Sequence, residues 1–212
     1  MDGEVIVAVQ TLNLARRFGR SWVLRDITLT VEEGQTVVLF GENGAGKTTL
    51  LRVLCGILTP HKGEGRIFGY DLKDRQSVRE HAFFLSNDQG LYMDLSVLEN
   101  LDFTRQMYKV QANLPALLER VGLEKAGQKR ARELSSGMRK RALLARMLIA
   151  PSPLLLIDEP FANLDEAGKQ FVLDILKEAQ QQGKTLIFTS HEPALALQLT
   201  DVQHTLQGGV FQ

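Results

Sequence analysis

The sequence is poor in several features that define other protein classes. Its 212 residues include one cysteine, Cys55, so no disulfide can form within the chain. Cys55 lies in the apolar stretch LLRVLCGIL, which favours a core residue over a reactive thiol. The 25 Lys and Arg balance 25 Asp and Glu, so no overall charge draws the chain to nucleic acid or anionic lipid. We therefore expect no nucleic-acid partner.

Long apolar runs are also missing. The longest purely apolar runs, 37–40 and 154–157, are far shorter than the roughly 20 residues of a membrane-spanning helix. The N-terminus has no basic segment followed by an apolar one, so nothing there resembles a secretory signal. We expect an unprocessed cytosolic chain that does not cross a membrane by itself. The composition, 44% hydrophobic and 24% charged, is that of an ordinary globular domain.

The strand patterns are of two kinds and predict an α/β fold. One kind mixes β-branched and polar residues, as in an antiparallel sheet, with turn signals at Glu33-Gly34 and Lys62-Gly63. It covers residues 5–14, 23–31 and 65–70. The other kind is continuously apolar, as in parallel strands covered on both faces. It covers residues 36–40, 154–157 and 185–188.

The middle of the chain has helical patterns. Ser96-Val97-Leu98-Glu99 fits a capping box at the start of a helix that runs to about Tyr108. Further helices are predicted over residues 113–121, from 135 to before Pro151, and over 166–182. We therefore predict one domain over residues 1–212, with a mainly parallel core sheet, an antiparallel β subdomain and a helical subdomain inserted at about 88–150.

A glycine-rich segment follows the first continuous apolar run. It fits the pattern G-x-x-x-x-G-K-[ST] and comprises Gly41, Glu42, Asn43, Gly44, Ala45, Gly46, Lys47, Thr48 and Thr49. Its position between a strand and a helix is the one that the phosphate-binding loop requires. There, backbone N–H groups would surround the phosphates, Lys47 would bridge the terminal phosphates, and the Thr48 hydroxyl would face Mg²⁺.

Two adjacent acidic residues, Asp158 and Glu159, end the apolar run 154–157. The carboxyl ends of parallel strands are where open α/β sheets bind ligands. An aspartate there can hold Mg²⁺ through water, and a glutamate can orient or deprotonate an attacking water. Together with the phosphate loop, the pair predicts a nucleoside triphosphate hydrolase.

Between these motifs lies Leu134-Ser135-Ser136-Gly137-Met138, which resembles the LSGGQ signature of ATP-binding cassette (ABC) ATPases. The order of motifs is also similar to that family over nearly the whole chain. Asn163-Leu164-Asp165 resembles its D-loop, His191 its switch histidine, and Phe18 the aromatic that stacks on adenine. The resemblance implies the P-loop fold of the ABC type, built on a RecA-like core, and a requirement for ATP and Mg²⁺.

The resemblance also implies the residue roles. Glu159, Lys47 and His191 would act on the γ-phosphate and the attacking water, and Thr48 and Asp158 would hold the metal. Ser135 and Gly137 would complete the ATP site of a second copy in a head-to-tail homodimer, because the start of a helix is an anion site. Asp165 would act across that dimer. ATP would close the dimer and hydrolysis would open it.

The sequence departs from the family pattern at three positions. Ser136 and Met138 replace a glycine and the glutamine of the signature, whereas Ser135 and Gly137 are kept. The place of a metal-contacting glutamine is taken by Asn87, which is one methylene shorter, so that Gln89 or a bridging water is an alternative contact.

Within the family, several classes are open. The phosphate loop and signature are too close in sequence for the long coiled coil of chromosome-maintenance relatives, and only one cassette is present, unlike in translation-factor relatives. We expect the ATPase subunit of a transporter, on the cytoplasmic membrane face, with permease subunits as separate chains. The altered signature resembles that of the haem-exporter ATPases of cytochrome c biogenesis. So does the Q-loop, the segment in which Asn87 replaces the metal-contacting glutamine. This resemblance implies cytochrome c maturation membrane proteins as partners. A small drug, peptide or polysaccharide exporter and a soluble regulatory ATPase are the alternatives.

Overall fold

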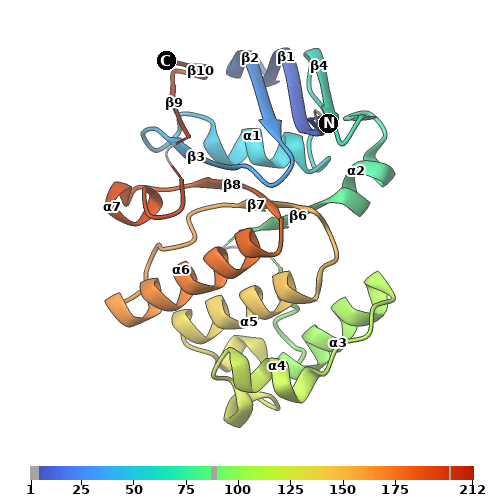
Figure 1. The fold of residues 1–212 in the computed structure, drawn as a ribbon, viewed down its shortest axis with the longest axis vertical. Coiled ribbons are helices and arrows are strands. Elements are labelled where there is room, and N and C mark those ends of the chain that lie inside the picture. Colours follow the sequence, from blue (N-terminus) through green and yellow to red (C-terminus); the bar gives the residue numbers. More distant parts are fainter. Residues whose placement is uncertain (1–4, 87–89, 201) are drawn as a thin grey trace. The chain divides into compact units, whose positions relative to one another are not determined.

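The computed structural model describes residues 5–86, 90–200 and 202–212 (Figure 1). Asn87 and Gln89, the two candidates for the metal-contacting amide, lie outside the described residues. The chain divides into two compact units. The first takes in the chain up to Phe84, residues 152–160 and the chain from Leu176 onward; the second takes in 85–151 and 161–175. The predicted helical insertion, residues 88–150, agrees with the first segment of the second unit but does not include residues 161–175.

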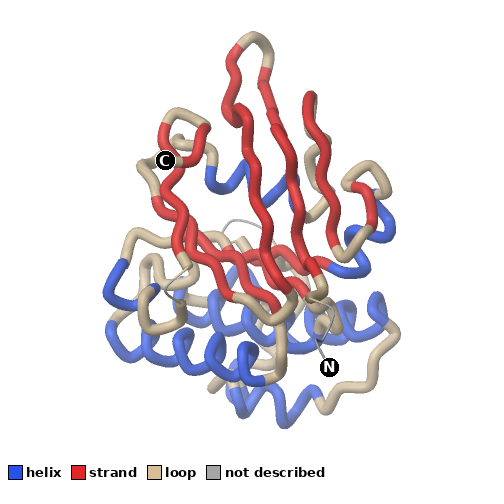
Figure 2. Tube along the Cα trace, turned by 45° about the horizontal axis from the view of Figure 1, so that its top comes forward, coloured by secondary structure: helices blue, strands red, loops and turns tan. Residues whose placement is uncertain are grey.

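The first unit contains an antiparallel sheet in the order β2-β1-β4-β5. Its strands are β1 Val7–Phe18, β2 Ser21–Glu32, β4 Lys62–Ile67 and β5 Tyr70–Asp71. The long β1–β2 hairpin and the neighbouring β4 are the extended red segments of Figure 2. Alternation of buried and exposed residues along β2 explains the pattern that the sequence shows, because one face is packed and the other solvated.

The predicted turn at Lys62-Gly63 is wrong, because both residues lie inside β4. Gly63 has φ +76°, and a Cβ atom there would collide with the backbone of Asn13 on β1. The register between β1 and β4 shifts at this point, between Leu12 and Ala15. Glycine here permits the close backbone approach of a bulge, so it marks an irregularity within a strand rather than its end.

A second sheet has the strand order β10-β9-β3-β8-β7-β6. Its strands are β3 Thr36–Phe40, β6 Ala82–Leu85, β7 Leu154–Ile157, β8 Thr185–Thr189, β9 Gln203–Gln207 and β10 Val210–Phe211. β3 pairs in parallel with β8 and β9, and β7 with β8. The continuous apolar runs are thus parallel strands, as predicted, and every residue of β7 and β8 is buried.

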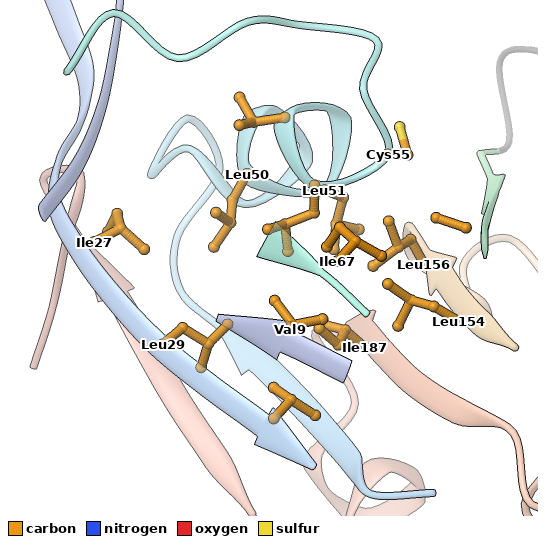
Figure 3. Close-up of a cluster of buried hydrophobic side chains, with 14 of the residues drawn as sticks. Val9, Ile27, Leu29, Leu50, Leu51, Cys55, Ile67, Leu154, Leu156 and Ile187 are labelled. Atoms are coloured by element: carbon orange, nitrogen blue, oxygen red, sulfur yellow. The ribbon is translucent and has the colours of Figure 1, made fainter. Parts of the chain in front are cut away.

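The core of the first unit brings together both sheets and the helix α1, Lys47–Leu54 (Figure 3). Leu50 and Leu51 of α1 belong to the same buried cluster as Val9 of the antiparallel sheet and Leu156 of the parallel sheet. Cys55, just after α1, is 3% exposed, and burial raises the pKa of its thiol to about 11. The thiolate is therefore scarce at neutral pH, in keeping with a packing role. Two short helices, α2 Arg75–His81 and α7 Pro193–Ala196, complete this unit.

The second unit is helical. It contains α3 Val97–Tyr108, α4 Leu114–Arg120, η1 Glu124–Ala126, η2 Ala131–Glu133, α5 Ser136–Ile149 and the first part of α6, Glu166–Gln181. Its buried cluster joins Val97 and Leu101 of α3 to Leu118 of α4 and Ala142 of α5. Phe171 of α6 packs on the same cluster, which explains why residues 161–175 belong to this unit.

The helix starts follow the local signals in the sequence. Ser96 Oγ accepts from the Glu99 N–H at 3.1 Å, and Glu99 Oε2 accepts from the Ser96 N–H at 2.7 Å. This reciprocal pair is the predicted capping box of α3. Asn113 caps α4 and Ser135 caps α5, each through a side-chain oxygen. Each cap satisfies a backbone N–H that has no partner inside its helix.

The capping box gives a test of stability. Hydrogen bonds from the Ser96 backbone and hydroxyl hold the pKa of Glu99 below its ordinary value. The stabilisation is therefore complete above that ordinary value and is lost as pH falls through the lower, folded-state pKa. We expect Ser96→Ala to lower the free energy of unfolding by about 1 kcal/mol in urea titrations near neutral pH.

Glu99→Gln is the matched variant, because it keeps an acceptor oxygen and removes only the charge. Its loss of stability relative to the parent should shrink as the pH is lowered, since the parent then protonates Glu99. An equal loss in neutral and acid solution would mean that the charge of Glu99 does not stabilise the helix start.

Candidate functional site

The phosphate loop joins β3 to α1 and depends on a backbone that only glycine adopts easily. Gly46, the residue before α1, has φ +109°. A Cβ atom there would lie 2.9 Å from both a methyl group of Leu24 and the carbonyl oxygen of Val23. Among the described residues, no side chain caps the start of α1. The first N–H groups of α1 are thus left to a ligand, and with the helix dipole they form an anion site.

Lys47, the first residue of α1, is 6% exposed and bends back over the loop. Its ammonium donates to the carbonyl oxygens of Gly41 at 2.6 Å and Glu42 at 3.2 Å. It also lies 3.3 Å from Nε2 of His191. A buried cation is costly unless its donors are satisfied, and these contacts satisfy them. The contacts place positive charge at the loop.

Asp158 follows β7 and accepts a hydrogen bond on each carboxylate oxygen. Thr48 Oγ1 donates to Oδ2 at 2.7 Å, and Thr189 Oγ1 donates to Oδ1 at 2.8 Å. The structure thus brings together Thr48 and Asp158, the two predicted metal ligands that lie in the described residues. Their hydroxyl and carboxylate oxygens are the hard ligands that Mg²⁺ prefers, so the donor set fits this ion.

Glu159 follows directly and has a left-handed backbone, with φ +49°. Such a conformation costs about 1–3 kcal/mol in a residue other than glycine and concentrates at functional sites. The Glu159 N–H donates to Thr189 Oγ1 at 2.8 Å, which helps to hold this conformation. One carboxylate oxygen, Oε1, lies 3.3 Å from His191 Nε2. His191 therefore lies within reach of both Glu159 and Lys47.

A cavity of about 310 Å³ lies over the phosphate loop. It is lined by Val23, Glu42, Asn43, Gly44, Gly46, Lys47, Thr48, Thr49 and Glu159. The predicted catalytic glutamate and most of the predicted phosphate-binding residues therefore share one cavity. Phe18 is not among its lining residues; it ends β1, beside the hairpin turn, and is 47% exposed.

The signature residues belong to the second unit. Ser135 and Gly137 lie at the start of α5, where the Ser135 hydroxyl accepts from the Met138 N–H at 3.2 Å. With Asp165, they line a cavity of about 210 Å³. Asp165 Oδ1 accepts from the Gly168 N–H at 2.8 Å, so this aspartate caps α6. The structure thus places three predicted site residues around one cavity.

Thr189 is the functional residue that the sequence reasoning missed. It is fully buried, and its one hydroxyl contacts both the Asp158 carboxylate and the Glu159 backbone. The sequence does contain a signal for such a role, because Thr189 is a polar residue directly after the run 185–188, at the carboxyl end of a predicted parallel strand. Its partner across the sheet could not be read from that run alone.

The fold and the phosphate site define a P-loop nucleoside triphosphatase. Comparison with known proteins narrows this class. The family model described as "ABC transporter" matches residues 24–162, about two thirds of the chain. The chain belongs to this family, is its ATP-binding domain, and is an ATP hydrolase of the ABC type.

Relatives and solved structures agree with this membership. The chain is 34% identical over 211 residues to the Nod factor export ATP-binding protein I of Cupriavidus pinatubonensis, covering 96% of this chain but 65% of that protein. It is 32% identical to the uncharacterised ABC transporter ATP-binding protein YybJ of Bacillus subtilis, covering 95% and 93%. A solved ATP-binding subunit of an ABC transporter is 27% identical with a TM-score of 0.88, covering 96% of this chain and 88% of that one.

Thr189 can be tested by two substitutions. Thr189→Val keeps the shape but leaves Asp158 Oδ1 and the Glu159 N–H without this partner, which should cost about 1–3 kcal/mol of unfolding free energy. ATP hydrolysis should fall with it, because both groups shape the site. Thr189→Ser keeps the hydroxyl and should restore most of the hydrolysis. Parent-like hydrolysis by the valine variant, in a steady-state assay, would refute a positioning role.

Proposed function

We propose that this chain is the ATP-hydrolysing subunit of an ABC transporter and that its residues act as the motifs predict. The observation that carries the proposal is the cluster in which His191 lies within 3.3 Å of both Lys47 and Glu159. Lys47 and the loop N–H groups hold the β- and γ-phosphates. His191 contacts the γ-phosphate, and Glu159 orients or deprotonates the attacking water. Phe18 stacks on adenine.

Thr48 and Asp158 hold Mg²⁺, with Asn87 as a further candidate ligand. The ion, when bound, would neutralise charge on the phosphate oxygens. The chain's own contribution is positional. The hydrogen bond between Thr48 and Asp158, and that between Thr189 and Asp158, fix the carboxylate before ligands arrive. Fixed donors and charges need no rearrangement during the reaction, which is the main source of electrostatic catalysis.

The second ATP contact comes from another copy of the chain. We propose a head-to-tail homodimer in which Ser135 and Gly137 of one copy face the γ-phosphate bound by the other, with Asp165 beside them. The support is the start of α5, a helix of 14 residues, where N–H groups and a serine hydroxyl form an anion site. Two solved structures of the cassette MJ0796, 23% and 22% identical to this chain, are described as dimeric.

The catalytic role of Glu159 has a direct test. Glu159→Gln keeps the size of the side chain and removes the base, so we expect ATP affinity to persist and turnover to fall by about 100-fold or more. The variant should also accumulate an ATP-bound dimer, measured by size-exclusion chromatography with Mg-ATP. Glu64→Gln, the same change at an exposed position of β4, is the matched control. Parent-like turnover in Glu159→Gln would remove Glu159 from the catalytic role.

We further propose that the chain works at the cytoplasmic face of a membrane, bound to separate permease subunits. None of the described helices is long and apolar enough to cross a bilayer. The proposed contact surface is the entry of the helical unit, residues 87–94. Its described part, 90–94, exposes Tyr92 and Met93. A solved chain of similar fold, cbiO1 from Clostridium perfringens, is 24% identical to this chain and is described as part of the ABC transporter complex cbiONQ.

We propose two candidates for the cargo of the transporter. The altered signature at Ser136 and Met138 supports the haem exporter of cytochrome c biogenesis, with cytochrome c maturation membrane proteins as partners. Relatives named for Nod factor export, at 32–34% identity, support the alternative of a small exporter with another cargo, a drug, peptide or polysaccharide. The chain spans 65% of the first of these relatives and 52% of an uncharacterised cyanobacterial one.

Affinity capture of the Glu159→Gln protein from native membranes with Mg-ATP separates these proposals. Recovery of polytopic cytochrome c assembly proteins, with haem absorbance, would support haem export. Recovery of an unrelated permease would keep the transporter function and change the cargo. If only soluble proteins are recovered, in repeats with parent protein and cross-linker, the transporter proposal fails and a soluble regulatory ATPase takes its place.

A further inference from the structure

Arg16 lies directly beside Phe18 but has no role in the site described above. Its guanidinium carbon is 4.9 Å from the centre of the Phe18 ring and lies over the ring face. Phe18 is 47% exposed. The arginine therefore covers part of the ring while much of it faces solvent. Arg16 and Phe18 are two residues apart on β1, at a point where the register with β2 shifts, and the contact itself shows that their side chains lie on the same side of the strand.

The guanidinium is anchored by a separate segment of the chain. Arg16 Nη1 donates to the carbonyl oxygen of Thr59 at 2.7 Å and lies 3.4 Å from Nδ1 of His61. These partners are 43 and 45 residues away in sequence, just before β4. Burial and the charges of Arg16 and Arg17 lower the pKa of His61, so its ring is neutral at neutral pH and Nδ1 can accept. Phe18 thus packs on a group fixed from outside its own hairpin.

The charged guanidinium of Arg16 is also partly removed from water. Its Nε is buried and has no hydrogen-bond partner among the residues that the structure describes. A guanidinium that is partly removed from water interacts more strongly with an aromatic face than an exposed one does. The Phe18 ring therefore compensates for hydration that Arg16 loses, and the contact holds the two side chains together.

We propose that Arg16 is a positioning residue for nucleotide binding, which holds the Phe18 ring so that its free face is ready to stack on the base. This inference rests on the proposed role of Phe18 as the adenine platform. Phenylalanine has no hydroxyl with which to anchor itself, so its orientation at an exposed hairpin end depends on what packs beneath it. Because stacking uses the π-face of a base and not its edges, Arg16 should support ATP and GTP binding equally.

The test compares Arg16→Ala with Arg17→Ala. Both remove one positive charge from the same hairpin, but Arg17 lies over Trp22, at 5.7 Å, and not over Phe18. We expect Arg16→Ala to weaken ATP binding by about 3- to 10-fold, the range of a partly desolvated cation–π contact, with kcat unchanged at saturating ATP. The factor should be the same for GTP. Arg17→Ala should bind as the parent does.

A double-mutant cycle with Phe18→Ala separates the inference from the proposal on which it rests. If Arg16 acts through Phe18, Arg16→Ala has no further effect in a chain that already carries Phe18→Ala. Additive effects, or a fall in kcat instead of affinity, would refute the positioning role. If Phe18→Ala itself leaves ATP affinity unchanged, the adenine platform fails. If Phe18→Ala weakens binding but Arg16→Ala does not, only the inference on Arg16 fails.

Discussion

The hydrogen bonds to Asp158 are the contacts on which the phosphate site depends. They join three separated segments, because Thr48 lies in the first turn of α1, Asp158 follows β7 and Thr189 ends β8. Parallel pairing of β3, β8 and β7 brings the carboxyl ends of these strands to one edge of the sheet. Loss of the carboxylate would leave the buried Thr189 hydroxyl and the half-buried Thr48 hydroxyl without this partner. The Asp158 carboxylate therefore reaches both partners only because the order of the strands brings their segments together.

Much of this arrangement is visible in the sequence wherever the signal is local. The parallel strands have continuous apolar runs, the capping box of α3 lies within four residues, and the phosphate loop is one uninterrupted pattern. Long-range contacts were harder to foresee. The sequence could not say that Thr189 would meet Asp158, or that Gly63 would pass close to Asn13, because both contacts depend on how distant strands pair. Lys62-Gly63 has the local pattern of a turn for the same reason, because only the pairing of β4 with β1 shows that this glycine lies within a strand.

The predicted residues divide between the two units in a way that bears on mechanism. Lys47, Asp158, Glu159 and His191 belong to the unit with both sheets, whereas Ser135, Gly137 and Asp165 belong to the helical unit. Lys47 and Glu159 line one cavity within the first unit, and Ser135, Gly137 and Asp165 line another within the helical unit. The proposed nucleotide contact of the helical unit uses residues of that unit alone, so a second copy of the chain could supply it. The proposed dimer requires only that each surface be preformed.

The cap at the start of α5 illustrates how one atom can satisfy two demands. In accepting from the Met138 N–H, the Ser135 oxygen uses a lone pair and leaves its hydroxyl hydrogen to point elsewhere. The helix cap and the proposed contact of Ser135 with a nucleotide therefore do not compete for the same part of the hydroxyl group. Threonine would preserve both, whereas asparagine would preserve the cap but offer amide hydrogens from a longer side chain in place of the hydroxyl. Fewer substitutions of Ser135 would therefore be accepted than helix capping alone would allow.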